Sequence, residues 1–303
     1  MSPAPLSHYV AYLRPRTFPI TFVFVLTGYA LAPHGGDGSE IATDLTFLLV
    51  VYSLLLWGGA NAYNSSQDRD EGPVNLLPNP PPVPPRLAAF GLALHGAAVG
   101  LALTRGAWSG VLTAIGAIGS ILYSWRGGWF RRLKEVPGVD NLVNACACGI
   151  LPVALGASAR GQAPSLHAWL VGAAFTVAVF GGVPTSQIFQ LRESDTVQTA
   201  RNWAAWVGPR RVLRLGAVLF VAHVALLVLV AAPSRPTATV VACWVCWATL
   251  VLAAAAHSLW WSRTPRVDPY RRMIRQLGMM MTSQTIWVVG VASTWLPTPL
   301  DRK

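Results

Sequence analysis

Three of the twelve acidic residues in the chain fall within four positions, as Asp68, Asp70 and Glu71. They belong to the segment 61–85, which reads NAYNSSQDRDEGPVNLLPNPPPVPP and follows an apolar run. Charge at the end of such a run is costly if the run lies in a membrane, so it indicates a functional site. An ordinary solvated loop after a membrane helix is the alternative interpretation.

The spacing of the polar residues in this segment indicates a cation site. On a helix, Asn64, Asp68 and Glu71 share one face, because they are separated by four and three positions. Clustered carboxylates repel one another and need a counter-ion. A hard cation with oxygen ligands, such as Mg²⁺, meets that need and usually brings a phosphorylated substrate with it.

A second polar cluster follows the apolar run 167–188. It contains Gln187, Gln190, Glu193 and Asp195. Between the two clusters lies the loop YSWRGGWFRRLK, which ends in Arg132 and Lys134. Two acidic clusters with a basic loop between them suit a diphosphate that Mg²⁺ bridges and that these two cations hold.

The elements that must position these residues are membrane helices. The chain is 53% hydrophobic and only 12% charged, whereas a typical soluble domain is about 25% charged. Runs of the length that a bilayer core demands recur along the chain. We therefore predict an all-α, polytopic membrane protein that forms one domain over residues 1–303. The nine expected spans are 17–33, 43–64, 87–104, 107–124, 139–157, 167–188, 212–231, 238–261 and 277–296.

The distribution of basic residues predicts the orientation. If the N-terminus is cytoplasmic, 18 of the 23 Lys and Arg residues lie in cytoplasmic segments, as the positive-inside rule requires. This explains the net charge of +11 without a nucleic-acid partner, since no recognisable nucleic-acid-binding module holds these residues. Both acidic clusters then face the cytoplasm. We expect no disulfide, no removable signal peptide and no obligate protein partner. The proline-rich stretch 78–85 serves as a rigid connector or as a lid.

These motifs and their order along the chain resemble those of the UbiA superfamily of intramembrane prenyltransferases. The segment Asn64-SSQ-Asp68-R-Asp70-Glu71 resembles the first Asp-rich motif of that family. Arg14-Pro15 is similar to its motif at the head of the first helix, and Tyr123-Ser124 with Arg132-Leu133-Lys134 resembles its tyrosine-to-lysine loop. The stretch from Gln187 to Asp195 resembles its second motif.

The resemblance implies nine helices around a central cavity and transfer of an isoprenyl group from an allylic diphosphate to an aromatic or quinone-precursor acceptor. It implies catalytic roles for Asp68, Asp70 and Asp195. The implied Mg²⁺ ligands are Asn64, Asp68, Asp70, Glu71, Glu193 and Asp195. The implied diphosphate contacts are Lys134, Arg132, Arg14, Tyr123, Asn64 and Gln190.

Two departures from the family pattern leave alternatives open. Gly72 stands where many members have the last Asp of the first motif, and Gln190 stands for the leading Asp of the second. A terpene cyclase of the same fold would ionise the same diphosphate without an acceptor. A transporter for an anionic or lipid-linked solute is a further alternative, but its site is expected near mid-span, where the predicted spans show no charge.

Overall fold

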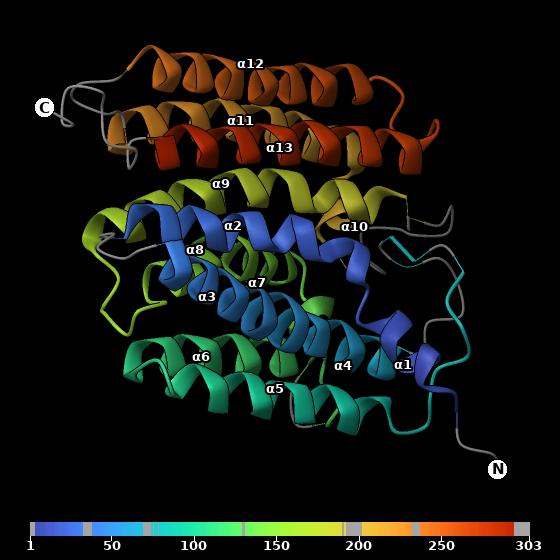
Figure 1. The fold of residues 1–303 in the computed structure, drawn as a ribbon. Helices are drawn as coiled ribbons and strands as arrows, with labels where there is room; N and C mark the ends of the chain where they lie inside the picture. The colour runs from blue at the N-terminus through green and yellow to red at the C-terminus, as the bar shows by residue number, and fades with distance from the viewer. Residues whose placement is uncertain are drawn as a thin grey trace, which may run out of the picture.

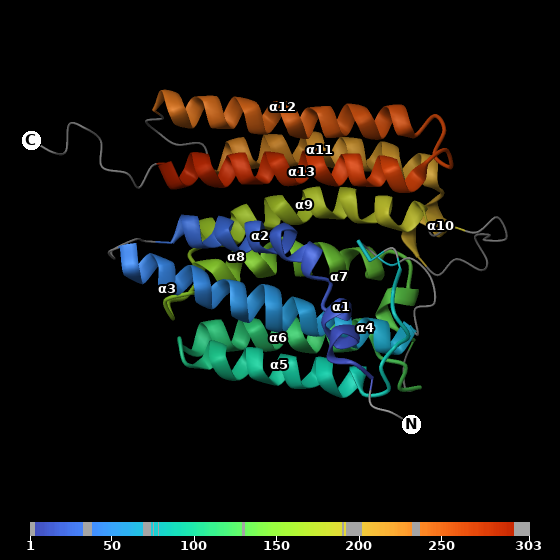
Figure 2. The ribbon, with the colours of Figure 1, turned by 45° about the vertical axis from the view of Figure 1, so that its right-hand side comes forward.

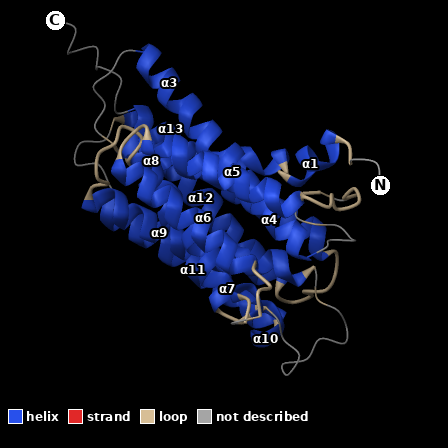
Figure 3. Cartoon of the chain, turned by 90° about the horizontal axis from the view of Figure 1, so that it is seen from below, coloured by secondary structure: helices blue, strands red, loops and turns tan. Residues whose placement is uncertain are grey.

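The computed structural model describes residues 4–32, 38–68, 74, 76–77, 79–128, 131–189, 191, 202–231 and 237–293. In this part of the chain all regular elements are helices, apart from an isolated bridge between Val74 and Leu77 (Figure 3). The prediction of an all-α fold is confirmed for these residues. Five predicted site residues lie outside them, namely Asp70, Glu71, Gln190, Glu193 and Asp195.

The helices lie side by side and run in roughly parallel or antiparallel directions (Figure 1). The α-helices are α1 (Leu6–Tyr12), α2 (Phe18–Leu31), α3 (Gly38–Leu48), α4 (Gly58–Asp68), α5 (Leu87–Leu103), α6 (Ala107–Ser124), α7 (Val139–Cys148), α8 (Ile150–Ala157), α9 (Leu166–Ile188), α10 (Trp203–Val207), α11 (Pro209–Ala231), α12 (Ala238–Trp261) and α13 (Pro269–Ala292). Two 3₁₀-helices, η1 (Pro15–Thr17) and η3 (Leu133–Glu135), and one π-helix, η2 (Leu49–Trp57), complete the described elements.

Within the described residues, six helical stretches are long and apolar enough to cross a membrane, judged by length and composition. They are 38–68, 107–124, 139–157, 166–188, 209–231 and 238–261, and each overlaps a predicted span. The remaining predicted ranges contain α2, α5 and α13. The chain is therefore a multi-pass membrane protein, while nine spans and a cytoplasmic N-terminus stay predictions.

Helices α2 and α8 meet at the centre of the bundle, with their backbones in contact. A Cβ atom on Gly28 would lie 1.8 Å from the carbonyl oxygen of Val153, and one on Gly156 would lie 1.9 Å from that of Val25. Small residues are what allow helices in a membrane to approach so closely. One core cluster packs this pair against α3, η2, α5 and α6, and a second packs α8 and α9 against α11, α12 and α13.

The stretch 38–68 is one long helix with an internal change of pitch. Its middle part, η2, is a π-helix, whose turns hold more residues than α-helical turns. The polar face of α4 therefore points in a different direction from the one it would have if α3 continued as an uninterrupted α-helix. The predicted span 139–157 is likewise divided, because the backbone breaks at Gly149 between α7 and α8. Hydrophobicity predicted the bounds of the span 139–157 but only the part 43–64 of the stretch 38–68, and it carried no signal for these irregularities.

A buried carboxylate ties three segments together at the end of the bundle opposite α4. Asp44 is only 4% exposed and accepts hydrogen bonds from Arg105 Nη1 (2.9 Å) and Arg160 Nε (2.8 Å). The Tyr29 hydroxyl donates to the same carboxylate at 3.0 Å. The hydrogen bond to Asp44 raises the pKa of Arg160. The α5–α6 turn and the α8–α9 loop are thus both anchored to α3.

Replacing this carboxylate is expected to destabilise the fold. Asp44→Asn leaves two arginines without their counter-charge, which costs about 3–5 kcal/mol for a fully buried pair. Both arginines reach solvent, so we expect a loss of about 2–3 kcal/mol in the free energy of unfolding. Equilibrium unfolding in detergent measures this. The exposed neighbour variant Thr43→Ala is the control, and equal stability of the two variants would contradict the anchoring role.

Candidate active site

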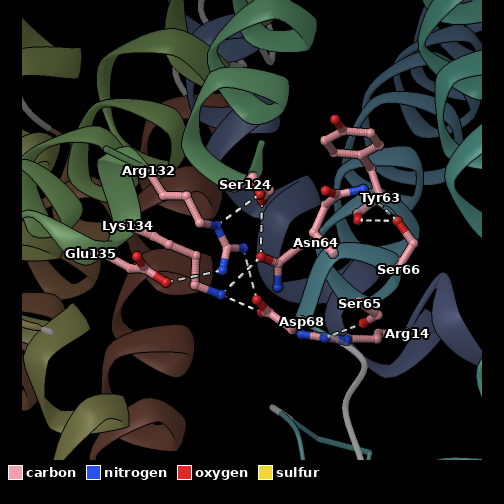
Figure 4. A network of polar contacts seen from close by, with 11 residues as sticks. Arg14, Tyr63, Asn64, Ser65, Ser66, Asp68, Ser124, Arg132, Lys134 and Glu135 are labelled. Atoms are coloured by element: carbon pink, nitrogen blue, oxygen red, sulfur yellow. Dashed lines mark hydrogen bonds and ion pairs between the residues drawn. The ribbon is translucent and has the colours of Figure 1, made fainter. Parts of the chain in front are cut away.

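Helix α4 ends in two oxygen donors that point to one place. Asn64 and Asp68 are one helical turn apart, so their side chains lie on the same face, and Figure 4 shows both directed toward the loop after α6. Asn64 is part-buried, and the Asp68 side chain is 16% exposed. This confirms the predicted shared face for the two members of the motif that the structure describes.

Two cations from the loop between α6 and α7 meet these oxygens. Lys134 Nζ donates to Asn64 Oδ1 at 3.2 Å and also pairs with Asp68 Oδ2. Arg132 Nη2 pairs with Asp68 Oδ1 at 2.8 Å. Both oxygens of the Asp68 carboxylate are therefore engaged by positive charge (Figure 4). The sequence predicts that Arg132 and Lys134 hold a diphosphate beside the first acidic motif, whereas their direct ion pairs with Asp68 were not predicted.

Further contacts fix the direction of the two cations. Arg132 is buried, its Nε donates to the carbonyl oxygen of Ser124 at 2.9 Å, and its Nη1 pairs with Glu135 at 3.3 Å. The Ser124 hydroxyl donates to Asn64 Oδ1 at 2.9 Å. The roles of Ser124 and Glu135 were not predicted from the sequence. The position of Ser124 at the last turn of α6, directly before the basic loop, was the available signal.

The structure places the other two described candidates next to this network. Arg14 is buried and its Nη2 donates to Ser65 Oγ at 2.8 Å, which brings its charge against α4. Tyr123 accepts a hydrogen bond at its hydroxyl from Asn144 Nδ2 at 2.8 Å. Arg14 therefore contacts the motif helix, whereas Tyr123 is oriented by α7.

A second buried carboxylate joins α7, α9 and α10 at the same end of the bundle. Asp140 Oδ2 accepts hydrogen bonds from Gln187 Nε2 (2.6 Å) and from the backbone N–H of Trp203 (3.2 Å). Gln187 Oε1 accepts in turn from the backbone N–H of Ala204 at 3.1 Å. These bonds hold the ends of the segment 189–202, which contains the predicted Glu193 and Asp195. Gln187, predicted to belong to the second acidic cluster, thus serves to fix the ends of that segment.

Pro184 interrupts the backbone hydrogen bonds near the end of α9, and a side chain of α7 supplies the missing donor. Pro184 has no N–H to offer to the carbonyl oxygen of Phe180, one turn earlier. Asn141 Nδ2 donates to that oxygen at 2.9 Å instead. A helix that would otherwise carry an unsatisfied carbonyl is thereby stabilised where it approaches the site.

The hydrogen bonds that Asp140 accepts lead to a testable prediction about stability. In Asp140→Asn an amide N–H₂ group replaces an oxygen that accepts hydrogen bonds, so at least one buried donor loses its partner. We expect a loss of about 1–3 kcal/mol in the free energy of unfolding. Chemical denaturation in detergent measures it, with the exposed Asp268→Asn as the control. A variant as stable as the control would contradict a stabilising role for these hydrogen bonds.

The described donors fit a hard cation. The oxygens of Asn64 and Asp68 already converge on one positively charged atom, Lys134 Nζ. Carboxylate and amide oxygens are ligands that Mg²⁺ accepts, and it usually retains several waters beside one or two carboxylates. In the described residues no group of three or more His, Cys, Asp or Glu side chains could hold a metal. The other four predicted ligands lie outside those residues.

Comparison with known proteins identifies relatives of the fold. A protein-family model described as "UbiA prenyltransferase family" matches residues 21–296 of the chain. A search of curated proteins finds no match.

The solved structures to which the chain is similar share little sequence with it. One belongs to work on digeranylgeranylglyceryl phosphate synthase in membranes, with a TM-score of 0.66, 14% identity and coverage of 95% of this chain and 99% of that one. A UbiA homolog from Archaeoglobus fulgidus bound to GPP and Mg²⁺ gives a TM-score of 0.66 at 16% identity, and coverage of 94% and 99%. The same homolog bound to DMAPP and Mg²⁺ gives 0.64 at 17% identity, with the same coverage.

Proposed function

We propose, because the chain belongs to the UbiA prenyltransferase family, that it transfers an isoprenyl group from an allylic prenyl diphosphate to an aromatic or other lipophilic acceptor within the membrane. The observation that carries this proposal is the network in Figure 4. Two oxygen donors, Asn64 and Asp68, and two cations, Arg132 and Lys134, converge at one end of a helical bundle. Similar structures bound to GPP or DMAPP with Mg²⁺ support it.

The oxygen donors would hold Mg²⁺ together with the diphosphate. We assign this role to Asn64 and Asp68 and, from the parts of the motifs outside the described residues, to Asp70, Glu71, Glu193 and Asp195. Bound Mg²⁺ supplies charge neutralisation to a departing diphosphate. Asp68 keeps its carboxylate ionised between two cations, so it can act as a ligand without first losing a proton.

The cations of the network would bind the diphosphate oxygens. Arg132 and Lys134 are held in place by Ser124, Glu135 and Asn64, so they are oriented before the substrate arrives. Such preorganised donors stabilise charge as it develops on a leaving group. We place Arg14, which lies against α4, in the same group, with Tyr123 and Gln190 as further contacts.

The proposed reaction has two stages, ionisation of the diphosphate and capture of the allylic cation. The allylic C–O bond breaks and the diphosphate leaves with the electron pair. An electron-rich carbon of the acceptor then attacks the allylic cation and loses a proton. The isoprenoid tail, which is apolar, would reach the site from the lipid side of the bundle, and the diphosphate would enter from the cytoplasmic face.

The experiment that tests this function uses purified full-length protein in detergent with Mg²⁺. Geranyl, farnesyl and geranylgeranyl diphosphates are each supplied with and without a panel of aromatic acceptors, and diphosphate release and prenylated product are measured. The proposal expects Mg²⁺-dependent release that requires an acceptor. Release without acceptor, with a cyclic hydrocarbon or alcohol as product, would identify a cyclase instead. Folded protein that is inactive with every donor would contradict the proposal.

A further inference from the structure

A hollow lined by four arginines lies at the same end of the bundle as α4, but on different elements. It has a volume of about 520 Å³ and lies between the start of α11 and the loop 262–268 that joins α12 to α13. Figure 2 shows α10, the start of α11 and this loop together at one end of the helices. The arginines are Arg210, Arg211, Arg263 and Arg266. We call this hollow the arginine cleft.

None of the four guanidinium groups is paired with a carboxylate in the described part of the chain, and Asp268, which ends the loop 262–268, does not line the cleft. No acidic residue lines the cleft. All four side chains are exposed, and none forms a side-chain hydrogen bond or ion pair. By contrast, Arg105, Arg132 and Arg160 are all paired with carboxylates. Like charges gathered in one concave surface raise the local concentration of anions, and guanidinium groups are suited to planar, bidentate contact with phosphate.

Both walls of the arginine cleft are fixed by internal contacts. On the loop side, Trp261 Nε1 donates to the carbonyl oxygen of Pro265 at 3.0 Å, and Arg272 Nη1 donates to that of Thr264 at 2.8 Å. On the helix side, the backbone N–H of Gly208 donates to the carbonyl oxygen of Ala204 at 3.1 Å, and that of Val212 donates to the carbonyl oxygen of Gly208 at 3.1 Å. Gly208 has a φ of 90°, a conformation that glycine adopts without strain. It turns the chain directly from α10 into α11. The cleft is therefore formed before any ligand binds, which reduces the entropy lost on binding.

The surroundings of the arginine cleft place it at the depth of lipid head groups. Trp206 directly precedes the lining residue Val207, and Trp260 and Tyr270 lie at the ends of α12 and α13 that the loop 262–268 joins. They are exposed by 48%, 47% and 40%. Exposed Trp and Tyr at the ends of spanning helices mark the membrane–water interface. Val267, at the edge of the cleft, is also exposed. A small anion in solution has no apolar part that could contact this apolar and aromatic rim, whereas a phospholipid has both a phosphate and adjoining acyl chains.

We propose that the arginine cleft binds the head-group phosphate of an anionic phospholipid. The guanidinium groups contact the phosphate oxygens, and the acyl chains lie along the exposed faces of α11 and α12. Basic pockets between membrane helices are suited to such lipids. The proposal concerns a site separate from the Asn64–Asp68 network and does not rest on the prenyl-transfer function.

The test measures thermal stability of full-length protein in a neutral detergent, without prenyl substrate, as phosphatidylglycerol is added. Binding to the folded state raises Tm in a concentration-dependent way. The cleft variant is Arg211→Gln/Arg263→Gln/Arg266→Gln. The control is Arg214→Gln/Arg271→Gln/Arg275→Gln, which removes the same charge from exposed positions at the same end of the bundle.

We expect phosphatidylglycerol to raise the Tm of the wild type and of the control, and phosphatidylcholine to raise it less. The apparent affinity of the cleft variant for phosphatidylglycerol should fall about tenfold or more, because several charge-assisted contacts are lost. An equal fall in the control would show a general charge effect and overturn the proposal. An equal response of wild type to inorganic phosphate would also overturn it, because the site would then recognise a free anion rather than a lipid.

Discussion

Asp68→Asn is expected to reduce Mg²⁺-dependent diphosphate release about 10³-fold in kcat/KM, an effect of the size seen when a preorganised charge at a reaction centre is removed. The substitution preserves side-chain volume but removes the negative charge that Arg132 and Lys134 share. It also replaces one oxygen, the atom type that Mg²⁺ prefers, by an amide nitrogen. Both the proposed metal contact and the orientation of the two cations are lost together.

Two measurements keep this result interpretable. Thermal unfolding of Asp68→Asn in detergent shows whether the variant is folded, because Arg132 and Lys134 lose a partner. Asp268→Asn is the matched control, since it makes the same chemical change at an exposed position with a positive φ, which Asn tolerates. Folded Asp68→Asn with activity within tenfold of the control would remove Asp68 from the proposed mechanism.

Lys134→Met is expected to reduce kcat about 10²- to 10³-fold, the effect of losing one donor that stabilises a developing anion. Met retains the length and apolar stem of the side chain, so the lost feature is the ammonium group. Because Lys134 touches both Asn64 and Asp68, we expect the Mg²⁺ concentration for half-maximal activity to change as well. Steady-state kinetics at several Mg²⁺ concentrations separate the two effects.

The control for this variant comes from the same loop. Arg131 is exposed, lies three positions before Lys134, and forms no side-chain hydrogen bond or ion pair with the described residues. Arg131→Met should change kcat less than about threefold, as expected for a solvated charge on the surface. Similar losses in the two variants would mean that the loop acts only through its total charge.

The sequence predicted those features of the site that depend on local spacing. One helical turn separates Asn64 from Asp68, and a rule about helix periodicity is sufficient to place them on one face. That Arg132 and Lys134 would share a diphosphate site with them was predicted from the order of charge clusters along the chain and from a family resemblance, but the direct contacts were not. No spacing rule places residues that are more than sixty positions apart.

The features that sequence reasoning missed are contacts between helices. Asp140 binds Gln187, 47 positions later, and Asn141 satisfies the carbonyl that Pro184 leaves without a partner. These depend on how α7 packs against α9, which hydrophobic periodicity does not encode. The π-helical turns of η2 and the break at Gly149 were missed for a related reason, because both lie inside runs that are apolar enough to be predicted as single spans, and tertiary packing decides their local geometry.

The most direct test of a diphosphate site at the end of α4 is Mg²⁺-dependent binding of geranyl thiolodiphosphate, an analogue that resists ionisation, measured by calorimetry on full-length protein in detergent. We expect the wild type and Asp268→Asn to bind the analogue only with Mg²⁺ present, and Asp68→Asn not to bind it at the same concentrations. Binding that is independent of Mg²⁺, or that persists in folded Asp68→Asn, would contradict the claim that the end of α4 is the diphosphate site.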